Sequence, residues 1–350
     1  KESAKDPEAY VLSVFTDSRQ VAATAPEEDA AVEFPYLPPP EKEGVIADRK
    51  DVNDLGIVQI DYENGLRLNY KKTDFKAKEV LVELSFGSGG SGEPADKPGL
   101  SILSKAVVNE SGIGPLDAED LNRALAGKNT SVNFDIEEDS FVFRANTVPG
   151  EIDLMLQLLY AHLTDPAFRQ EAYRLAMQRY RLAYLENSRS VEGAIRLHAD
   201  RFLAGGDPRF GLPDFEMFKK LNLEDVRSWL KKAFDQNSLE LSVVGDFDPK
   251  KLEESVSKHL GGLALGKHAG TNPENIESPV FPSGDSLGLP IKTEIPKAIV
   301  VLAYPTDDFW EIGRVRRLSV LANIVSERLR VTVREKLGAS YSPYAYNRSS

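Results

Sequence analysis

Cysteine is absent from the 350 residues of this sequence. Disulfide bonds and thiolate zinc sites are therefore excluded, and the redox compartment stays open. No apolar run approaches the roughly 20 residues that a bilayer-spanning helix needs. The net charge of −12 argues against nucleic acid as a partner, because phosphate binding needs a basic surface. A hydrophobic fraction of 41% indicates a globular protein with a sizeable core.

Histidine is scarce as well. The chain contains only His162, His198, His259 and His268. A metalloprotease helix needs two histidines on one face with a glutamate between them, as HExxH or HxxEH. No two histidines of this chain are four residues apart, and the GxSxG elbow of serine hydrolases is missing too. A zinc site assembled from histidines distant in the sequence is the remaining alternative.

The stretch 239–262 predicts a strand, a turn and a helix. An apolar run at 239–244 is typical of a buried strand. Asp248 can cap a helix, and Pro249 suits its first position, where a backbone N–H would lack a partner anyway. Leucine or valine recurs at positions 252, 256 and 260, which gives the helix one apolar face before Gly261 ends it.

The chain before this stretch alternates between strand and helix patterns. We predict strands at 57–62, 66–70, 80–86, 132–136 and 141–145, and helices at 100–110, 117–126, 152–163, 168–182, 191–203 and 224–234. The two last strands flank an acidic turn and form a hairpin with one buried face. Strands, then helices, then one more strand and helix predict an α+β domain over 57–263.

Two segments flank this domain. Residues 1–56 are acidic and rich in proline, and we interpret them as a linker with the tail of a preceding domain. A second linker spans 264–290. The segment 291–350 contains a predicted strand at 297–304, a helix at 315–329 and a strand at 340–346. This order loosely repeats the opening of the first domain, so we expect 291–350 to be the start of a second, truncated copy. The chain begins without methionine, and we interpret it as part of a longer protein.

Two short sequence segments resemble motifs of the pitrilysin/insulinase family of zinc peptidases (inverzincins). The first is VVGDFDPKKLEESV at 243–256, which resembles the closing unit of a family domain. The second is REKLGASYS at 334–342, which resembles a signature in the non-catalytic half. The resemblance covers 57–350. It implies repeated two-layer α+β domains of the LuxS/processing-peptidase type, each a mainly antiparallel sheet covered by helices.

The family's zinc motif is degenerate in this chain. In the family, Gly-x-Ala-His-x-x-Glu-His provides two zinc-binding histidines and a glutamate that polarises the attacking water. The matching positions here are Ile102, Lys105 and Ala106, so both histidines and the glutamate are replaced. The resemblance therefore implies that 57–263 keeps the fold without a metal site, and that this fragment contains no catalytic residue and is inactive alone.

The resemblance also implies two substrate-binding residues, Arg334 and Tyr341. In the family the matching arginine and tyrosine reach the zinc site from the inert half. Both side chains donate hydrogen bonds without losing a proton at neutral pH, and the tyrosine can donate to the oxyanion that forms at the scissile carbonyl. The alternative is an ordinary surface arginine at a helix end, followed by Gly338 as a helix stop and a strand tyrosine.

The resemblance implies the non-catalytic, substrate-binding half of a zinc peptidase. Zinc is expected in the missing N-terminal catalytic half, which belongs to the same chain or to a partner subunit. An extended peptide is the expected substrate, bound by pairing with a sheet edge. The alternative is an inert structural or assembly subunit of the same fold. Bacterial members are often exported, so the resemblance points to the periplasm.

Overall fold

The computed structural model describes residues 33–236, 238–266, 279–292, 296–306 and 310–348. The chain divides into two compact units, Lys1–Lys297 and Ala298–Ser350. The expected tail of a preceding domain falls within residues 1–32 and lies outside the described residues, as does His268. None of the described helices combines the length and the hydropathy that crossing a membrane requires.

The first unit is built on one sheet, whose strands have the order β1-β2-β3-β7-β4-β6-β5 in the described part of the chain. The strands are β1 Ile46–Val52, β2 Ile57–Tyr62, β3 Arg67–Lys72, β4 Val80–Phe86, β5 Ser131–Ile136, β6 Phe141–Thr147 and β7 Leu239–Gly245. Strands β3 and β7 are parallel, and every other neighbouring pair is antiparallel. The predicted mainly antiparallel sheet is confirmed.

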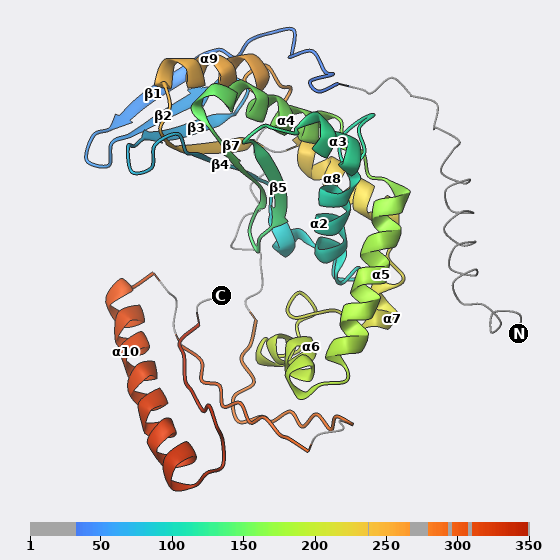
Figure 1. Ribbon diagram of the computed structural model, residues 1–350, viewed down its shortest axis with the longest axis vertical. Coiled ribbons are helices and arrows are strands. Elements are labelled where there is room, and N and C mark those ends of the chain that lie inside the picture. The colour runs from blue at the N-terminus through green and yellow to red at the C-terminus, as the bar shows by residue number, and fades with distance from the viewer. Residues whose placement is uncertain (1–32, 237, 267–278, 293–295, 307–309, 349–350) are drawn as a thin grey trace, which may run out of the picture. The chain divides into compact units, whose positions relative to one another are not determined.

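Helices cover one face of this sheet (Figure 1). The helices of this unit are α2 Leu100–Ser111, α3 Ala118–Ala124, α4 Ile152–Thr164, α5 Gln170–Asn187, α6 Val191–Leu203, α7 Phe215–Phe218, α8 Leu223–Gln236 and α9 Pro249–His259. Buried and exposed residues alternate along β4 and β7, so one face of the sheet packs into the core and the other meets solvent. Helix α2 packs against α5, α8 and β5, and α4 packs against α9. The predicted α+β class with a two-layer domain is confirmed.

The strand-turn-helix unit β7–α9 has the predicted form. The Asp248 side chain accepts hydrogen bonds from the N–H groups of Lys250 and Lys251 at 3.0 and 3.4 Å. Pro249 takes the first helical position. Gly245 adopts φ +146°, and a side chain there would meet the Glu79 carbonyl oxygen at 2.1 Å. Only glycine fits this close approach, which lets β7 turn into α9 beside the start of β4.

The first strand of the sheet, β1, precedes residue 57, where we predicted that the domain begins. Strand β1 pairs with β2 in antiparallel register. Six of its seven residues are exposed, so the strand has no apolar alternation that could reveal it in the sequence. Upstream of β1, Tyr36 donates a hydrogen bond to Asp165 at 3.1 Å. Part of the predicted linker 1–56 is therefore packed on the domain. The other boundaries, 263, 264–290 and 291, stay predictions.

The second unit contains a long helix, α10 Ile312–Leu329, which continues as a π-helical segment, Arg330–Lys336. The predicted helix 315–329 is confirmed. The strands predicted at 297–304 and 340–346 are wrong, because their described residues form no strand. A strand needs a neighbouring strand to satisfy its backbone groups, and no strand in the described part of the chain lies beside either segment. The apolar side chains of Val300 and Leu302 are accordingly 84% and 78% exposed.

Candidate substrate-binding pair and degenerate metal site

Helix α2 carries Ile102, Lys105 and Ala106, the predicted positions of a degenerate zinc motif, and a carboxylate caps the start of the helix. Glu93 accepts hydrogen bonds from the N–H groups of Gly99 and Ser101, both at 2.7 Å. These donors would otherwise lack partners at the helix N-terminus. A negative charge there is also stabilised by the helix dipole. The first turn of α2 is therefore anchored to the loop that follows β4.

The side chains at the motif positions serve packing and charge pairing. Ile102 and Ala106 are half-buried and pack against the hydrophobic core. Lys105 Nζ lies 2.7 Å from Asp135 Oδ1 on β5. Burial alone would raise the pKa of Asp135, but the hydrogen bonds from Lys105 and from the Ile136 N–H hold that pKa below its usual range. The lysine thus connects α2 to β5 at the position that the resemblance predicts to match the family's glutamate.

These residues do not fit a zinc ion. Two aliphatic side chains and a paired ammonium group offer no lone pair to a metal, whereas zinc takes imidazole nitrogen, thiolate or carboxylate. Within the described ranges, no group of three or more histidine, aspartate or glutamate side chains is placed to hold a metal. No catalytic step is therefore assigned to this part of the chain.

One residue of this face was not indicated by the sequence. Asn109 lies one turn after Lys105 on α2, and its side chain pairs with both backbone groups of Phe134 on β5. Asn109 Oδ1 accepts from the Phe134 N–H at 2.8 Å, and Asn109 Nδ2 donates to the Phe134 carbonyl oxygen at 2.8 Å. The spacing of four residues puts Lys105 and Asn109 on one helix face. A motif search cannot detect this pair, because its partner is backbone.

The two predicted substrate-binding residues lie together in the second unit. The guanidinium carbon of Arg334 is 4.5 Å from the centre of the Tyr341 ring, which is a cation–π contact. Both side chains are exposed, Tyr341 to 79%. The stacking restricts the arginine, so its N–H donors and the phenol hydroxyl are presented from neighbouring positions. Such a pair can donate several hydrogen bonds to carbonyl oxygens.

The local backbone explains how seven residues of chain bring these side chains together. Gly338 adopts φ +58° and ends the helical segment, and its N–H donates to the Arg334 carbonyl oxygen at 3.1 Å. The chain then reverses and runs back along α10. Ser326 Oγ donates to the Ala345 carbonyl oxygen at 2.8 Å and accepts from the Ala345 N–H at 2.7 Å. This anchor fixes the segment that follows Tyr341.

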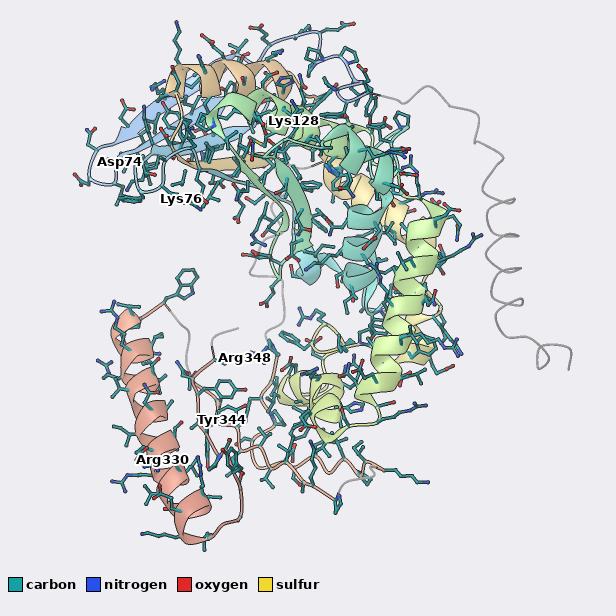
Figure 2. All side chains as sticks on the ribbon, in the orientation of Figure 1. Asp74, Lys76, Lys128, Arg330, Tyr344 and Arg348 are labelled. Carbon is teal, nitrogen blue, oxygen red and sulfur yellow. The ribbon has the colours of Figure 1, made fainter. Side chains whose placement is uncertain are left out.

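An arginine also reinforces the junction between α10 and the π-helical segment (Figure 2). Arg330 donates to Glu327 at 2.5 and 2.8 Å and bonds to Glu335 as well. Most of these groups are exposed, so each ion pair contributes little by itself. Together these ion pairs connect Glu327 to Glu335 through Arg330, across the segment that carries Arg334.

Residues 220–350 match the family model described as the Peptidase M16 inactive domain. Over these residues the chain resembles the M16 peptidase family, and the part that it resembles is the family's inactive domain. The match includes the β7–α9 unit and the segment with Arg334 and Tyr341. The resemblance to pitrilysin-type zinc peptidases is confirmed.

Two named relatives are similar to a larger share of the chain than residues 220–350. The chloroplastic stromal processing peptidase of Arabidopsis thaliana is 26% identical over 267 residues, which are 73% of this chain and 21% of that protein. A protein of Helicobacter pylori named non-peptidase homolog YmxG is 23% identical over 271 residues, which are 75% of this chain and 61% of that protein. The chain thus spans about a fifth of the length of the Arabidopsis relative.

A solved structure supports the fold. The periplasmic protease PqqL from Escherichia coli superposes with a TM-score of 0.65 at 16% identity, over 97% of this chain and 37% of that chain. At this identity the likeness concerns the fold alone. The roles of Arg334 and Tyr341 are not tested by these comparisons and stay proposals.

Proposed function

We propose that this chain is the substrate-binding, non-catalytic half of an M16 zinc peptidase that degrades peptides or processes proteins. The observation that carries the proposal is the contact between Arg334 and Tyr341, 4.5 Å from guanidinium carbon to ring centre. Cation–π pairing at an exposed site stabilises by only about 0.5–1 kcal/mol. Because the contact adds so little to the stability of the fold, a role in binding explains this exposed pair of donors better than a role in folding.

The chemistry of the pair suits an extended peptide in a peptidase. Arg334 offers a planar set of N–H donors to the carbonyl oxygens of the substrate backbone. The Tyr341 hydroxyl donates to the oxyanion that forms when the scissile carbonyl is attacked. In this proposal the zinc ion and the general base come from the N-terminal catalytic half, in the same protein or in a partner subunit. The periplasmic location stays a prediction.

The test is a kinetic comparison in the protein that contains both halves. Tyr341→Phe removes one donor to the oxyanion, and such a loss costs about 100-fold in kcat. Arg334→Lys keeps the charge but loses the planar donor set, and we expect mainly a higher KM. Tyr346→Phe is the matched control, because Tyr346 is also exposed and its ring stacks on Tyr344. Unchanged kcat and KM in both test variants contradict the proposal.

A second candidate is an inert structural or assembly subunit of the same fold. It is supported by the likeness to the Helicobacter pylori protein that is named a non-peptidase homolog. Under this alternative Arg334 and Tyr341 are ordinary surface residues. The two functions are separated by assaying peptide cleavage in the full-length protein: stable assembly without any cleavage supports the subunit, and zinc-dependent cleavage supports the peptidase half.

A further inference from the structure

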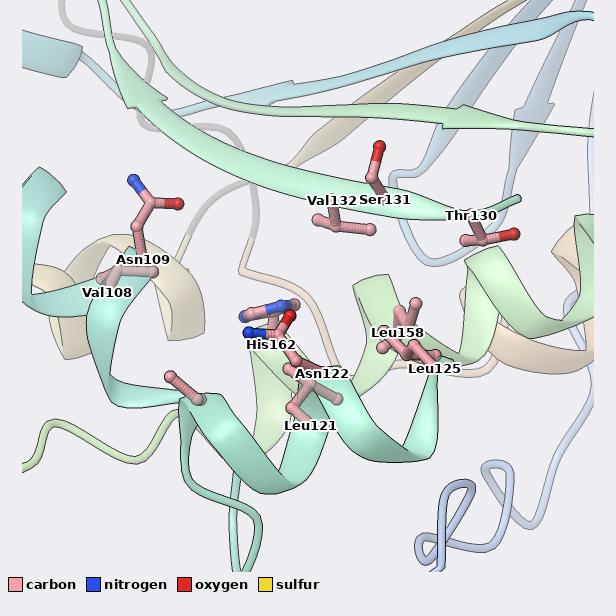
Figure 3. Close-up of a pocket in the computed structure, with 12 residues that line it drawn as sticks. Val108, Asn109, Leu121, Asn122, Leu125, Thr130, Ser131, Val132, Leu158 and His162 are labelled. Carbon is pink, nitrogen blue, oxygen red and sulfur yellow. The ribbon is translucent and has the colours of Figure 1, made fainter. Parts of the chain in front are cut away.

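A cavity of about 280 Å³ lies between α2, α3, β5 and α4 (Figure 3). Its size is close to the lower end of the range for ligand sites, which is roughly 300–1,000 Å³. By comparison with an apolar cavity of roughly 150 Å³ that holds one benzene ring, it has room for a molecule of about eight non-hydrogen atoms. The volume therefore suits a small molecule.

The walls of the cavity are apolar because two hydrophobic clusters meet there. Val108 belongs to the main core, and Leu158 belongs to a smaller, separate cluster. Half-buried Val132 packs against both clusters. Among the described residues that line the cavity, none is an acid, a lysine or an arginine. A charged ligand would lose its hydration there without gaining a partner, so the cavity suits a neutral, mainly aliphatic molecule.

Two polar side chains of the lining already have partners. Asn109 bonds to the backbone of β5. The Thr130 hydroxyl donates to Glu151 at 2.8 Å and also bonds to the Thr147 hydroxyl at 2.7 Å. A ligand therefore gains no hydrogen bond from these two groups without breaking an existing one. His162 is the buried polar side chain of the lining that is still available.

His162 offers the cavity one hydrogen-bond donor. The residue is 8% exposed, and its Nδ1 is enclosed with no hydrogen-bond partner among the described residues. Burial lowers the pKa of His162 to about 4, so the ring is neutral at pH 7 and has one N–H and one acceptor nitrogen. An enclosed N–H without a partner is rarer than an acceptor without one, so we place the proton on Nε2. The Nε2–H is the donor that is left for a ligand.

We propose that this cavity is a binding site for a small, neutral aliphatic carbonyl compound, such as an ester or a ketone. The Nε2–H of His162 donates to the carbonyl oxygen, and the aliphatic part packs against Leu125, Val132 and Leu158. An alcohol or an amide fits less well, because it brings an O–H or N–H group that finds no free acceptor inside the cavity. The segment with Arg334 and Tyr341 takes no part, so this site does not depend on the proposed function.

The test is a titration of the 350-residue chain with methyl pentanoate, followed by amide chemical shifts in NMR spectra of the deuterated protein. We expect saturable shifts at the lining residues of α3 and β5. Hexanoate has the same carbon and oxygen atoms but carries a charge, and it should bind more weakly by about tenfold or more. N-methylpentanamide replaces the ester oxygen by an N–H group, and its unpaired donor should weaken binding by about fivefold or more.

Two variants and one control variant locate the site. Ala118→Leu puts a larger side chain at a lining position and should abolish the shifts that the ester causes. His162→Leu removes the donor and should weaken binding of the ester about fivefold, the effect of one hydrogen bond. Ala126→Leu makes the same change as Ala118→Leu at an exposed position outside the cavity and should leave binding as it is.

Four results overturn the proposal. They are an absence of saturable shifts with the ester, shifts that persist in Ala118→Leu, an unchanged affinity in His162→Leu, and an amide that binds as tightly as the ester. The last of these would show that the bound molecule needs an N–H group, which the proposed site does not accommodate.

Discussion

The side-chain amide of Asn109 pairs with both the N–H and the C=O of Phe134, each at 2.8 Å. A helix side chain here replaces the hydrogen bonds that a neighbouring strand would make. Lys105, one turn earlier, binds Asp135 on the same strand. In this chain, an amide and an ion pair thus connect helix α2, where the degenerate zinc motif is predicted, to the edge strand.

Asn109→Ala is expected to destabilise the chain by about 2 kcal/mol, because it leaves the N–H and C=O of Phe134 without partners in a part-buried site. The measurement is urea unfolding. Asn133→Ala on the same strand is the control, since Asn133 is exposed and its bond to Phe134 is 3.4 Å long. We expect that control to stay within about 0.5 kcal/mol of the wild type. Equal stability of both variants would show that the amide bonds contribute nothing.

Strands with one buried face could be predicted from the sequence. β4 to β7 each have apolar residues at alternate positions, and the predicted ends agree with the structure to within two residues. β1 shows the reverse case, because a strand exposed on both faces has no apolar period to detect. The segment 297–304 has the apolar run but no partner strand in the described part of the chain. Whether a segment forms a strand depends on a partner strand elsewhere in the chain, and the apolar pattern of the segment itself carries no information about that partner.

The candidate site was predictable only in part, for a similar reason. Arg334 and Tyr341 were proposed from resemblance, and their contact depends on the reversal at Gly338, which a glycine after a helical pattern does indicate. The role of Asn109 was not predictable, because its partner is the backbone of a strand 25 residues later. The cavity beside His162 likewise depends on four separate elements.

Zinc should be neither bound by this chain nor needed for its stability. In the predicted match to the zinc motif, Ile102 and Ala106 take the places of the histidines, and Lys105 is paired with Asp135. We expect less than stoichiometric zinc by elemental analysis after dialysis, and the same Tm with and without a chelator. One zinc per chain that survives dialysis, together with a lower Tm in the chelator, would contradict the interpretation of the degenerate motif.

Asp153→Ala should loosen α4 from α9. Asp153 Oδ1 lies 2.8 Å from Nε2 of His259, which is fully buried. Without the carboxylate this buried nitrogen has lost its partner, at a cost of about 2 kcal/mol in the free energy of unfolding. Glu254→Ala on α9 is the control, because its pair with Lys250 is exposed and 3.9 Å long. If both variants unfold at the same urea concentration, the buried pair does not stabilise the contact.

Acid should destabilise the protein through His162 before its carboxylates titrate. Burial lowers the pKa of His162 from 6.5 to about 4. The unfolded chain therefore binds a proton more readily than the folded one. The contribution of His162 to stability is complete above pH 6.5 and declines as the pH falls towards 4, by about 3 kcal/mol in total.

The measurement of this pH effect is the free energy of unfolding in urea between pH 7.5 and pH 4.5, compared among three proteins. His162→Leu removes the titrating ring, so its curve should fall less steeply than that of the wild type over this interval. Burial also lowers the pKa of His259. The stability of His162→Leu should therefore still fall with the pH, but less steeply than that of the wild type. His198→Leu, at an exposed position, should reproduce the wild-type curve. If His162→Leu and the wild type lose stability in parallel, His162 is not the residue that makes the fold sensitive to acid.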